Sequence, residues 1–546
     1  MSRRPRAQIG AVGRLEKQLG SLPVIADFCR RLDIAGVVDR ACPMRDLPLS
    51  LTHGQVIEAL IANRLTSPKA MVAVADWADG WAVNEVFGIH PDALNDDRLG
   101  RALDALAPQV DQVVGSIGAK AIDAFGIDVT QIQWDMTSIS LHGAYNQIDD
   151  NHPAPGWGHP KDRRTDLKQI QAGLAVTADG GIPVFHRAYD GGAGEVAQVV
   201  DTMDALHTLA GTRTFLLAGD SKLISYTNIT AMAKANITFL APLAASRVPD
   251  GLFAGLDPAQ ATIVEYTTER DENASIFRNR STYRIMEDTM DLAGPRKKDP
   301  IHQVRRILVY STANAQAQAK ARALKLAKAR TDLDTLTRTA GTRHYPTSET
   351  VTAKATTIAR HRRVVAYLNT TVTTDDDGKP TFTWSFDQAA IDAEAAADGW
   401  YALLTNLPAE IDATEVFLRY KDQPIVERRY GEFKGPLAVA PIFLHSNQRI
   451  TALITVICLA LLIFCLIERE VRRNLAPDTE MYGFYLNDGR RRKPTGRLIL
   501  QALGELRLIP PPREQRGQTA TIPKPGRLQA QLLDLLRVDP TQPRWP

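Results

Sequence analysis

The chain has 546 residues, of which 44% are hydrophobic and 23% are charged. This length predicts about three or four domains, and the composition excludes a wholly disordered protein. Lysine and arginine number 65 against 62 acidic residues, which gives a net charge of +3. A basic coat over the whole surface is therefore excluded, whereas local basic patches are not.

The cysteines and the N-terminal residues narrow the class further. The four cysteines form no CxxC pair, which excludes a zinc ribbon and a disulfide framework. The first residues, MSRRPRAQ, lead into no apolar stretch, so no secretory signal is predicted. We therefore expect a cytoplasmic protein.

Residues 1–125 are expected to form a helical N-terminal domain. Thr52 and Gln55 have the spacing of a capping box, and the apolar residues Val56, Ile57 and Leu60 follow at helical spacing. Such a domain is compatible with binding of DNA ends and equally with structural support.

Residues 126–243 have the texture of an α/β core. Gln131–Thr137 is typical of a strand that carries an acid, and residues 170–177 and 182–189 predict a hairpin closed by Ala178-Asp179-Gly180-Gly181. A helix over Glu195–Ala210, a strand over Thr214–Gly219, a helix over Tyr226–Ala235 and a strand over Ile237–Ala241 follow. This order predicts a sheet with both antiparallel and parallel neighbours.

An insertion interrupts this core. Residues 244–398 contain several alternating stretches and one Ala/Lys-rich helix near 313–335, and we expect an inserted, largely β subdomain. The core resumes over residues 399–474, beginning with the strand Trp400–Thr405. Residues 475–546 form a basic, proline-punctuated C-terminal tail, for which partial disorder is expected.

One apolar run lies within the resumed core. Residues 451–467 (TALITVICLALLIFCLI) are almost wholly apolar, and a membrane span needs about 20 such residues. The run occurs once and is bounded by Arg449 and by Glu468, Arg469 and Glu470. This context favours a buried core helix, with a membrane anchor as the alternative.

Acidic residues suggest a metal site. Asp135 and Asp220 each lie on or at the end of an apolar strand, where a carboxylate is costly unless it is paired or bound to metal. Asp220 also has an ordinary explanation as a helix cap. Together with Glu427 they would form an oxygen-only site, which suits Mg²⁺ or Mn²⁺ and not zinc. Two such ions about 3.5–4 Å apart can catalyse phosphodiester displacement.

The segment 420–434 (YKDQPIVERRYGEFK) carries the most informative spacing. If it is helical throughout, Tyr420, Gln423, Glu427 and Lys434 share one narrow face. Pro424 favours the first turn of a helix and interrupts the run just before it. Glu427 and Lys434 remain on one face either way, which suits metal ligation beside a phosphate contact or, alternatively, an exposed charged face.

These residues resemble a known family. Asp135, Asp220 and Glu427 are similar to the acidic triad of DDE transposases with an RNase H-like core, and Tyr420-x2-Gln423-x3-Glu427-x6-Lys434 resembles the Y-x2-R-x3-E-x6-K signature of the IS4 superfamily. Gln423 departs from the arginine of that signature. Residues 158–169, 189–191 and 441–468 look most like the IS1634 family.

The resemblance implies an activity and its partners. It implies an RNase H-like core and a DDE transposase that cleaves insertion-sequence ends and joins the 3′-hydroxyl to target DNA. It further implies two Mg²⁺ or Mn²⁺ ions held by the acidic triad, terminal inverted repeats recognised with help from the N-terminal domain, and a homodimer on double-stranded DNA. A nucleoid-associated location in a bacterial cytoplasm, without a membrane, follows.

Basic residues extend this expectation to DNA contacts. Lys161, Arg163, Arg164 and Lys168 lie between two predicted core strands, where a sheet edge would meet a duplex. With Tyr420, Gln423 and Lys434 they are the predicted DNA-binding residues. Phosphate contacts of this kind give affinity and not sequence preference. Trp157 and Tyr145 are candidates for stacking on a splayed base, although packing explains them equally well.

Two other classes stay open. Gly192-Ala193-Gly194-Glu195-Val196-Ala197 matches the GxGxxA pattern of a dinucleotide-binding turn. The preceding strand follows a hairpin, however, and such a turn normally follows the first apolar strand of a βαβ unit. A DNA-binding transposon relic without catalysis is the second alternative, against which the intact acidic triad argues.

Overall fold

The computed structural model divides into two compact units. One comprises Met1–Gly219, Ala231–Ile237 and Asp422–Pro546, and the other comprises Asp220–Thr230 and Thr238–Lys421. The residues described are 16–44, 51–143, 145, 149–211, 213–267, 281–439, 442, 444–476, 479–485, 491–510 and 520–541.

The N-terminal part of the first unit is helical, as the sequence predicted. Its helices are α1 (Leu22–Arg31), α2 (Ile34–Ala41), α3 (His53–Thr66), α4 (Val74–Gly80), α5 (Val83–Phe87), α6 (Asp96–Leu106) and α7 (Val110–Phe125), with the 3-10 helices η1 (Met71–Ala73), η2 (Pro91–Ala93) and η3 (Ala107–Gln109). The predicted capping box is confirmed: the Gln55 N–H donates to Thr52 Oγ1 at 3.1 Å, and the Thr52 N–H donates to Gln55 Oε1 at 3.0 Å. It starts α3, whose apolar residues are buried.

A mixed sheet follows in the first unit. Its strands are β2 (Gln131–Leu141), β3 (Lys168–Thr177), β4 (Pro183–Tyr189) and β5 (Leu216–Ala218), in the order β4-β3-β2-β5, and helix α8 (Glu195–Ala210) connects β4 to β5. β3 is antiparallel to both β2 and β4, whereas β5 is parallel to β2. The predicted hairpin, helix and mixed sheet are therefore confirmed.

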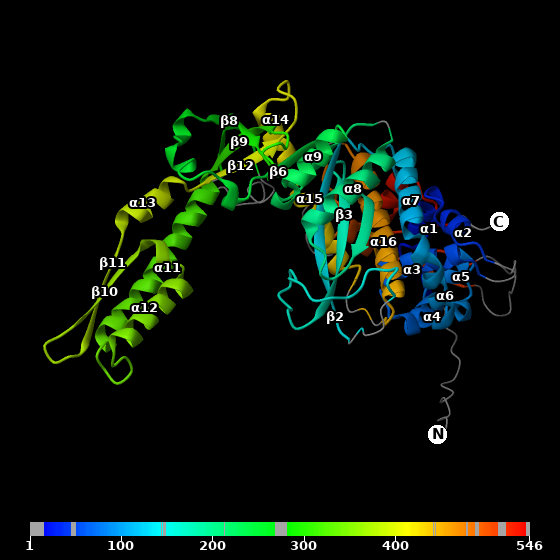
Figure 1. Cartoon of the computed structure of the whole chain (residues 1–546). Helices are drawn as coiled ribbons and strands as arrows, with labels where there is room; N and C mark the ends of the chain where they lie inside the picture. The colour runs from blue at the N-terminus through cyan, green and yellow to red at the C-terminus, as the bar shows by residue number, and fades with distance from the viewer. Residues whose placement is uncertain are drawn as a thin grey trace. The chain divides into compact units, whose positions relative to one another are not determined.

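The apolar run forms the central helix of the first unit. Helix α16 (Asn447–Arg473) packs against α3, α6 and β4 and lies among these elements in Figure 1. It is long and apolar enough to cross a membrane, yet its most apolar stretch is wholly buried inside the fold. This is the arrangement expected of a core helix, because neighbouring helices and a sheet cover all of its sides.

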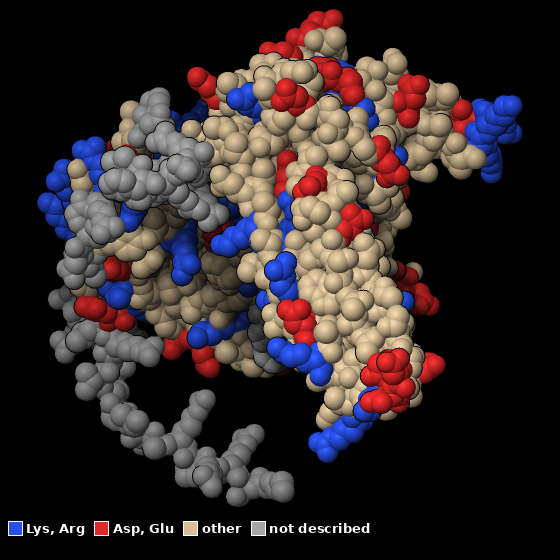
Figure 2. Space-filling view, turned by 90° about the vertical axis from the view of Figure 1, so that its left-hand side faces the viewer, with Lys and Arg blue, Asp and Glu red and all other residues tan. Residues whose placement is uncertain are grey.

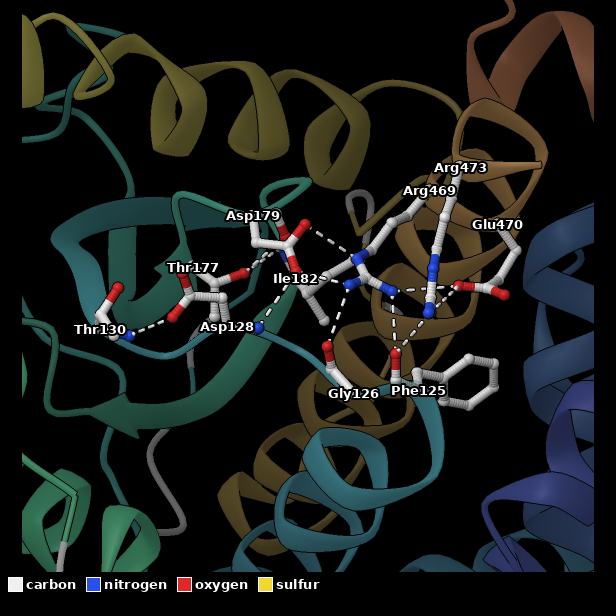
Figure 3. Close-up of polar contacts among 10 residues, drawn as sticks. All are labelled: Phe125, Gly126, Asp128, Thr130, Thr177, Asp179, Ile182, Arg469, Glu470 and Arg473. Carbon is white, nitrogen blue, oxygen red and sulfur yellow. Dashed lines mark hydrogen bonds and ion pairs between the residues drawn. The ribbon is translucent and has the colours of Figure 1, made fainter. Parts of the chain in front are cut away.

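The charged end of α16 ties three elements together (Figure 3). The Arg469 guanidinium donates to Asp179 in the β3–β4 turn, with Nε 3.0 Å from Oδ1, and to the backbone carbonyls of Phe125 at 3.1 Å and Gly126 at 3.2 Å. Those carbonyls lie at the C-terminal end of α7, where the helix dipole favours a cation. Arg469, one of the charged residues that bound the apolar run, therefore links α16 to α7 and to the β3–β4 turn within the first unit.

The C-terminal region contains more structure than predicted. It holds α17 (Gly496–Leu503) and α18 (Arg527–Leu536), both packed on α16, and β13 (Arg507–Leu508), which pairs with β1 (Lys17–Gln18) near the other end of the chain. Ile499, Leu503 and Leu532 are buried. The expectation of a partly disordered tail fails for these segments because their apolar residues recur at helical spacing; residues 477–478, 486–490, 511–519 and 542–546 lie outside the described part.

The second unit is built on an antiparallel sheet. Its strands are β6 (Thr238–Pro242), β7 (Thr262–Val264), β8 (Tyr283–Leu292), β9 (His302–Ser311) and β12 (Trp400–Thr405), in the order β6-β12-β9-β8-β7. The unit also has α14 (Ala413–Tyr420) and the 3-10 helices η4 (Ser221–Leu223), η5 (Ala245–Arg247), η6 (Phe253–Gly255), η7 (Pro258–Gln260) and η8 (Val365–Tyr367), while α9 (Tyr226–Lys234) crosses the boundary between the residue ranges of the two units.

A helical extension of this unit corrects one prediction. Helices α11 (Thr312–Thr339) and α12 (Ser348–Arg362) pack beside the hairpin β10 (Leu368–Thr374) and β11 (Pro380–Phe386), with α13 (Gln388–Ala396) after it (Figure 1). They share a small core around Leu333, Val351 and Phe382. The prediction of a largely β insertion is wrong here: the Ala-rich helix is longer than expected and needs α12 to cover its apolar stripe. The other domain boundaries remain predictions.

Candidate active site

Strand β2 presents Asp135 on a polar face. Side chains alternate along a strand, so Trp134 and Met136 point to the opposite face from Gln133 and Asp135. Trp134 packs over Gly173, where a Cβ atom would come 2.1 Å from the indole ring. The Asp135 side chain is 14% exposed, which makes it a largely buried carboxylate with one side open.

A lysine from the loop between β2 and β3 contacts this carboxylate. Lys161 Nζ lies 3.2 Å from both Asp135 oxygens and also donates to the Met136 carbonyl. The Lys161 backbone N–H donates to Ser138 Oγ at 2.8 Å. Of the four predicted basic loop residues, Lys161 is thus placed on an acid of the predicted triad.

Glu195 is a second acid at this place, and the sequence reasoning did not include it. It is the first residue of α8, and its Oε1 lies 3.2 Å from the Met136 backbone nitrogen, which also donates to Asp135 Oδ1 at 2.8 Å. β4 runs in the same direction as β2, because each is antiparallel to β3. The helix after β4 therefore starts at the edge where β2 ends, which is the signal that could have found Glu195.

Asp220 reaches the same place through strand register. It is bonded to Gly219, the last residue of the first unit, and lies two residues after the end of β5. Gln133 pairs with Ala218 in parallel register, so Asp220 comes level with Asp135 two residues further along. Within the first unit, one carboxylate oxygen of Asp135 lies within 4.8 Å of one of Glu195. Asp220 also caps η4, accepting from the Lys222 N–H at 2.8 Å.

The structure does not bring Glu427 into that group. The segment 420–434 is not one helix: α14 ends at Tyr420 and α15 (Pro424–Lys434) starts at the proline. The interpretation that four side chains share one face is therefore wrong, because Pro424 lacks the N–H that would continue the run. Glu427 and Lys434 do share a face of α15. Glu427 is exposed in its first turn.

Helix α15 is nevertheless fastened to the strand that carries Asp135. The Tyr430 hydroxyl lies 2.7 Å from the Asp135 carbonyl oxygen and 3.0 Å from that of Ala172 on β3. Burial raises the pKa of Tyr430 well above its ordinary value, and the negative charges of Asp135 and Glu195 add to this. Tyr430 lies one turn after Glu427, so this contact places the Glu427 face of α15 toward β2.

A buried ion pair holds the other side of α15. Arg429 donates to the Gly181 carbonyl at 3.1 Å and to Glu468 of α16 at 3.2 Å, and both side chains are less than a tenth exposed. Burial alone would raise the pKa of Glu468, but Arg429, Arg472 and the Gly496 N–H outweigh it and lower that pKa. The helix that carries Glu427 is thus fixed to the core of the first unit.

Lys434 brings positive charge to the same region. Its pKa is lowered, first by burial and further by Lys161, while Asp162 and Asp135 act in the opposite direction. Asp162 accepts from the Ser140 hydroxyl at 2.6 Å, which lowers the pKa of Asp162. Two lysines, from a loop and from a helix, therefore lie near Asp135.

The other predicted DNA-binding residues do not contact these acids in the interactions described. Arg163 is exposed, Arg164 pairs with Asp166 at 2.7 Å, and the Lys168 ammonium donates to the Tyr145 carbonyl at 3.3 Å. Gln423 precedes α15, and Tyr420 lies near the Tyr401 ring in the second unit. On the face drawn in Figure 2, basic and acidic side chains are interspersed among other residues.

In the glycine-rich turn before α8, Gly191, which precedes the GxGxxA match, is required by packing. Gly191 approaches the 154–158 segment so closely that a Cβ atom would come 2.0 Å from the Gln169 carbonyl oxygen and 2.5 Å from the Gly156 nitrogen. In addition, β4 is the outer strand of the first unit's sheet and follows a hairpin. This strand position counts against a dinucleotide-binding turn, which normally follows the first strand of a βαβ unit.

Residues 15–115 match a domain of unknown function, DUF4277, and no curated protein matches the chain. Solved structures that resemble the chain include the piggyBac transposase synaptic complex with hairpin DNA, at 9% identity and a TM-score of 0.36 over 83% of this chain and 77% of that chain. The Mos1 transposase paired-end complex with left transposon end matches at 10% identity and a TM-score of 0.15 over 40% of this chain and 76% of that chain.

Proposed function

We propose that this chain is a DDE transposase of the IS4 superfamily, most similar to the IS1634 family, that cleaves insertion-sequence ends and transfers the freed strand to target DNA. The observation that carries the proposal is the parallel pairing of β2 with β5, whose register brings Asp220, two residues after β5, level with Asp135 on β2. The helix that carries Glu427 is hydrogen-bonded to the backbone of Asp135 through Tyr430. The strand order β4-β3-β2-β5, in which an antiparallel hairpin precedes a parallel neighbour, supports an RNase H-like core.

The donor set suits divalent cations. Asp135, Asp220 and Glu427 are the proposed ligands of two Mg²⁺ or Mn²⁺ ions, and Glu195 adds a carboxylate that the sequence reasoning did not include. All of these donors are oxygens, which hard divalent cations prefer. When bound, such ions activate the attacking oxygen and stabilise the leaving oxygen of a phosphodiester.

The chemistry consists of two displacements at phosphorus. Water attacks the phosphodiester at the element end, a new oxygen–phosphorus bond forms, and the 3′-oxygen leaves as a hydroxyl group. That hydroxyl group then attacks a phosphodiester of the target strand, and the target's own 3′-oxygen leaves. Lys434 and Lys161, which lie near Asp135, would contact the phosphate, while Arg163, Arg164, Lys168, Tyr420 and Gln423 would hold the flanking duplex as a homodimer joins both ends.

Strand cleavage tests the proposal. The substrate is a labelled duplex that carries the inverted repeats flanking the gene, incubated with wild-type protein or Asp135→Asn in Mg²⁺, Mn²⁺ or Ca²⁺. We expect nicking at the end with Mg²⁺ or Mn²⁺ and none with the variant. Binding without cleavage in every metal would identify a DNA-binding relic and overturn the proposed activity. Absence of both binding and cleavage would overturn the assignment to transposition.

A further inference from the structure

The Lys161 ammonium fills the open side of Asp135. It lies 3.2 Å from both carboxylate oxygens and also contacts the carbonyl of Met136. An ammonium group has three N–H donors and no acceptor, so these three oxygens use its whole donor capacity. Asp135 therefore has its charge balanced by a cation that belongs to the chain itself.

The position of Lys161 makes this ion pair exchangeable. The Lys161 side chain is 49% exposed, whereas that of Asp135 is 14% exposed. Its backbone is fixed by the Ser138 hydroxyl, but its four-carbon stem is flexible, and an ammonium group that leaves the carboxylate enters water directly. The ammonium group regains water when it leaves, and the incoming divalent cation then balances the charge of the largely buried carboxylate.

We propose that Lys161 is an internal counter-ion that competes with a divalent cation for Asp135 and is released when the cation binds. This rests on the proposed metal site. A cation at Asp135 and an ammonium group on both oxygens of the same carboxylate repel each other and compete for the same lone pairs. Binding of the cation therefore weakens the ion pair, and the ion pair weakens binding of the cation.

Release of Lys161 would couple metal binding to phosphate binding. Glu195 lies beside Asp135, and Lys434 is close enough to Asp162, Lys161 and Asp135 for their charges to shift its pKa. Asp162 is already bonded to Ser140. A freed Lys161 thus lies next to Lys434, where two ammonium groups can meet one phosphate. By linkage, a phosphate that binds the freed lysine also strengthens metal binding.

Metal affinity without DNA tests the competition. Mn²⁺ is titrated into wild type, Lys161→Met and Lys120→Met, with free Mn²⁺ followed by electron paramagnetic resonance. Lys120 is the matched control because it is 40% exposed and pairs with a different carboxylate, Asp33, at 2.6 Å. We expect Lys161→Met to bind Mn²⁺ roughly threefold to tenfold more tightly and Lys120→Met to match wild type. Asp135→Asn should lose the site.

The outcomes separate this inference from the proposed function. If wild type binds Mn²⁺ and Asp135→Asn does not, the metal site stands, and an unchanged affinity in Lys161→Met would then overturn the competition alone. If neither wild type nor Lys161→Met binds Mn²⁺, both the metal site and the competition are wrong.

Lysine labelling gives a second readout that needs no variant. An amine-reactive ester is applied with and without Mg²⁺, and the modified peptides are quantified by mass spectrometry. Release predicts that Mg²⁺ increases the modification of Lys161 and leaves that of Lys120 unchanged. A Lys161 that becomes less reactive, or stays equally reactive, in saturating Mg²⁺ would contradict the release.

Discussion

Helices α8 and α15 both bring a glutamate toward strand β2, but they do so differently. Glu195, at the start of α8, shares the Met136 N–H with Asp135. Glu427, in the first turn of α15, is exposed, and its helix is held to β2 through Tyr430. Glu427, which the motif spacing predicted, therefore lies outside the group of carboxylates around Asp135 in the DNA-free chain. Glu195 lies inside that group, although no sequence motif indicates it.

This difference suggests that the two glutamates act at different stages. A carboxylate already next to Asp135 contributes to cation binding in the protein alone, because charge and ligand count set the affinity of an oxygen site. A carboxylate on an exposed helix face has to meet the cation together with the substrate. The proposed chemistry therefore requires α8 for binding of the cation and α15 for the step in which the cation and the substrate are bound together.

The sharpest test substitutes each glutamate separately. Glu427→Gln should reduce strand cleavage roughly 100-fold or more yet leave the Mn²⁺ affinity of the DNA-free protein near that of wild type. Glu195→Gln should weaken Mn²⁺ binding about tenfold or more. Titration and cleavage of the labelled duplex measure the two effects. Equal loss of Mn²⁺ affinity in both variants would remove the distinction between the helices.

The anchoring of α15 can be broken at its buried ion pair. Arg429→Met should destabilise the protein by about 3 kcal/mol, because it leaves Glu468 buried without its main partner. Urea-induced unfolding, followed at the transition of the first unit, measures the change in the free energy of unfolding. Arg101→Met, which breaks an exposed ion pair with Asp97 in the same unit, is the control and should change the free energy of unfolding by less than about 1 kcal/mol. Similar losses in both variants would contradict the role of the pair.

The same pair predicts a dependence of stability on pH. The pKa of Glu468 is lowered from its ordinary value of 4.5, so its charge stabilises the folded state fully above pH 4.5, and this contribution is lost as the pH falls through the lowered pKa. The difference in unfolding free energy between wild type and Glu468→Gln should therefore narrow below pH 4.5. Urea unfolding at several pH values measures this difference. A difference that stays constant down to pH 3 would contradict the lowered pKa of Glu468.

The smallest expected effect is at the contact between α15 and β2. Tyr430→Phe removes the hydroxyl that binds the carbonyls of Asp135 and Ala172, and we expect a loss of about 1 kcal/mol in stability. Cleavage should fall with it if this contact positions Glu427. Tyr482→Phe, at a tyrosine that is 55% exposed, serves as the control in both measurements. Full cleavage by Tyr430→Phe would show that the contact supports the fold alone.

Much of the fold follows from local sequence patterns. The hairpin at residues 168–189, helix α8 and strand β12 were predicted closely, because alternation and helical periodicity record which face of an element is buried. The capping box at Thr52 was found for the same reason, since both of its partners lie within four residues. The prediction failed at α12, where burial depends on packing against α11 and the β10–β11 hairpin. It also failed at α17 and α18, whose apolar residues do recur at helical spacing but lie in a basic, proline-punctuated segment.

The sequence by itself determined that acids lie on apolar strands, that a proline starts the helix carrying Glu427, and that one apolar helix belongs in a core. Only the tertiary structure decided which acids meet, because that depends on the register of β2 and β5 and on the direction of β4. It also placed the Lys161 ammonium on Asp135. Local spacing specifies the face of an element on which a side chain lies, whereas pairing between elements specifies the side chains that it meets there.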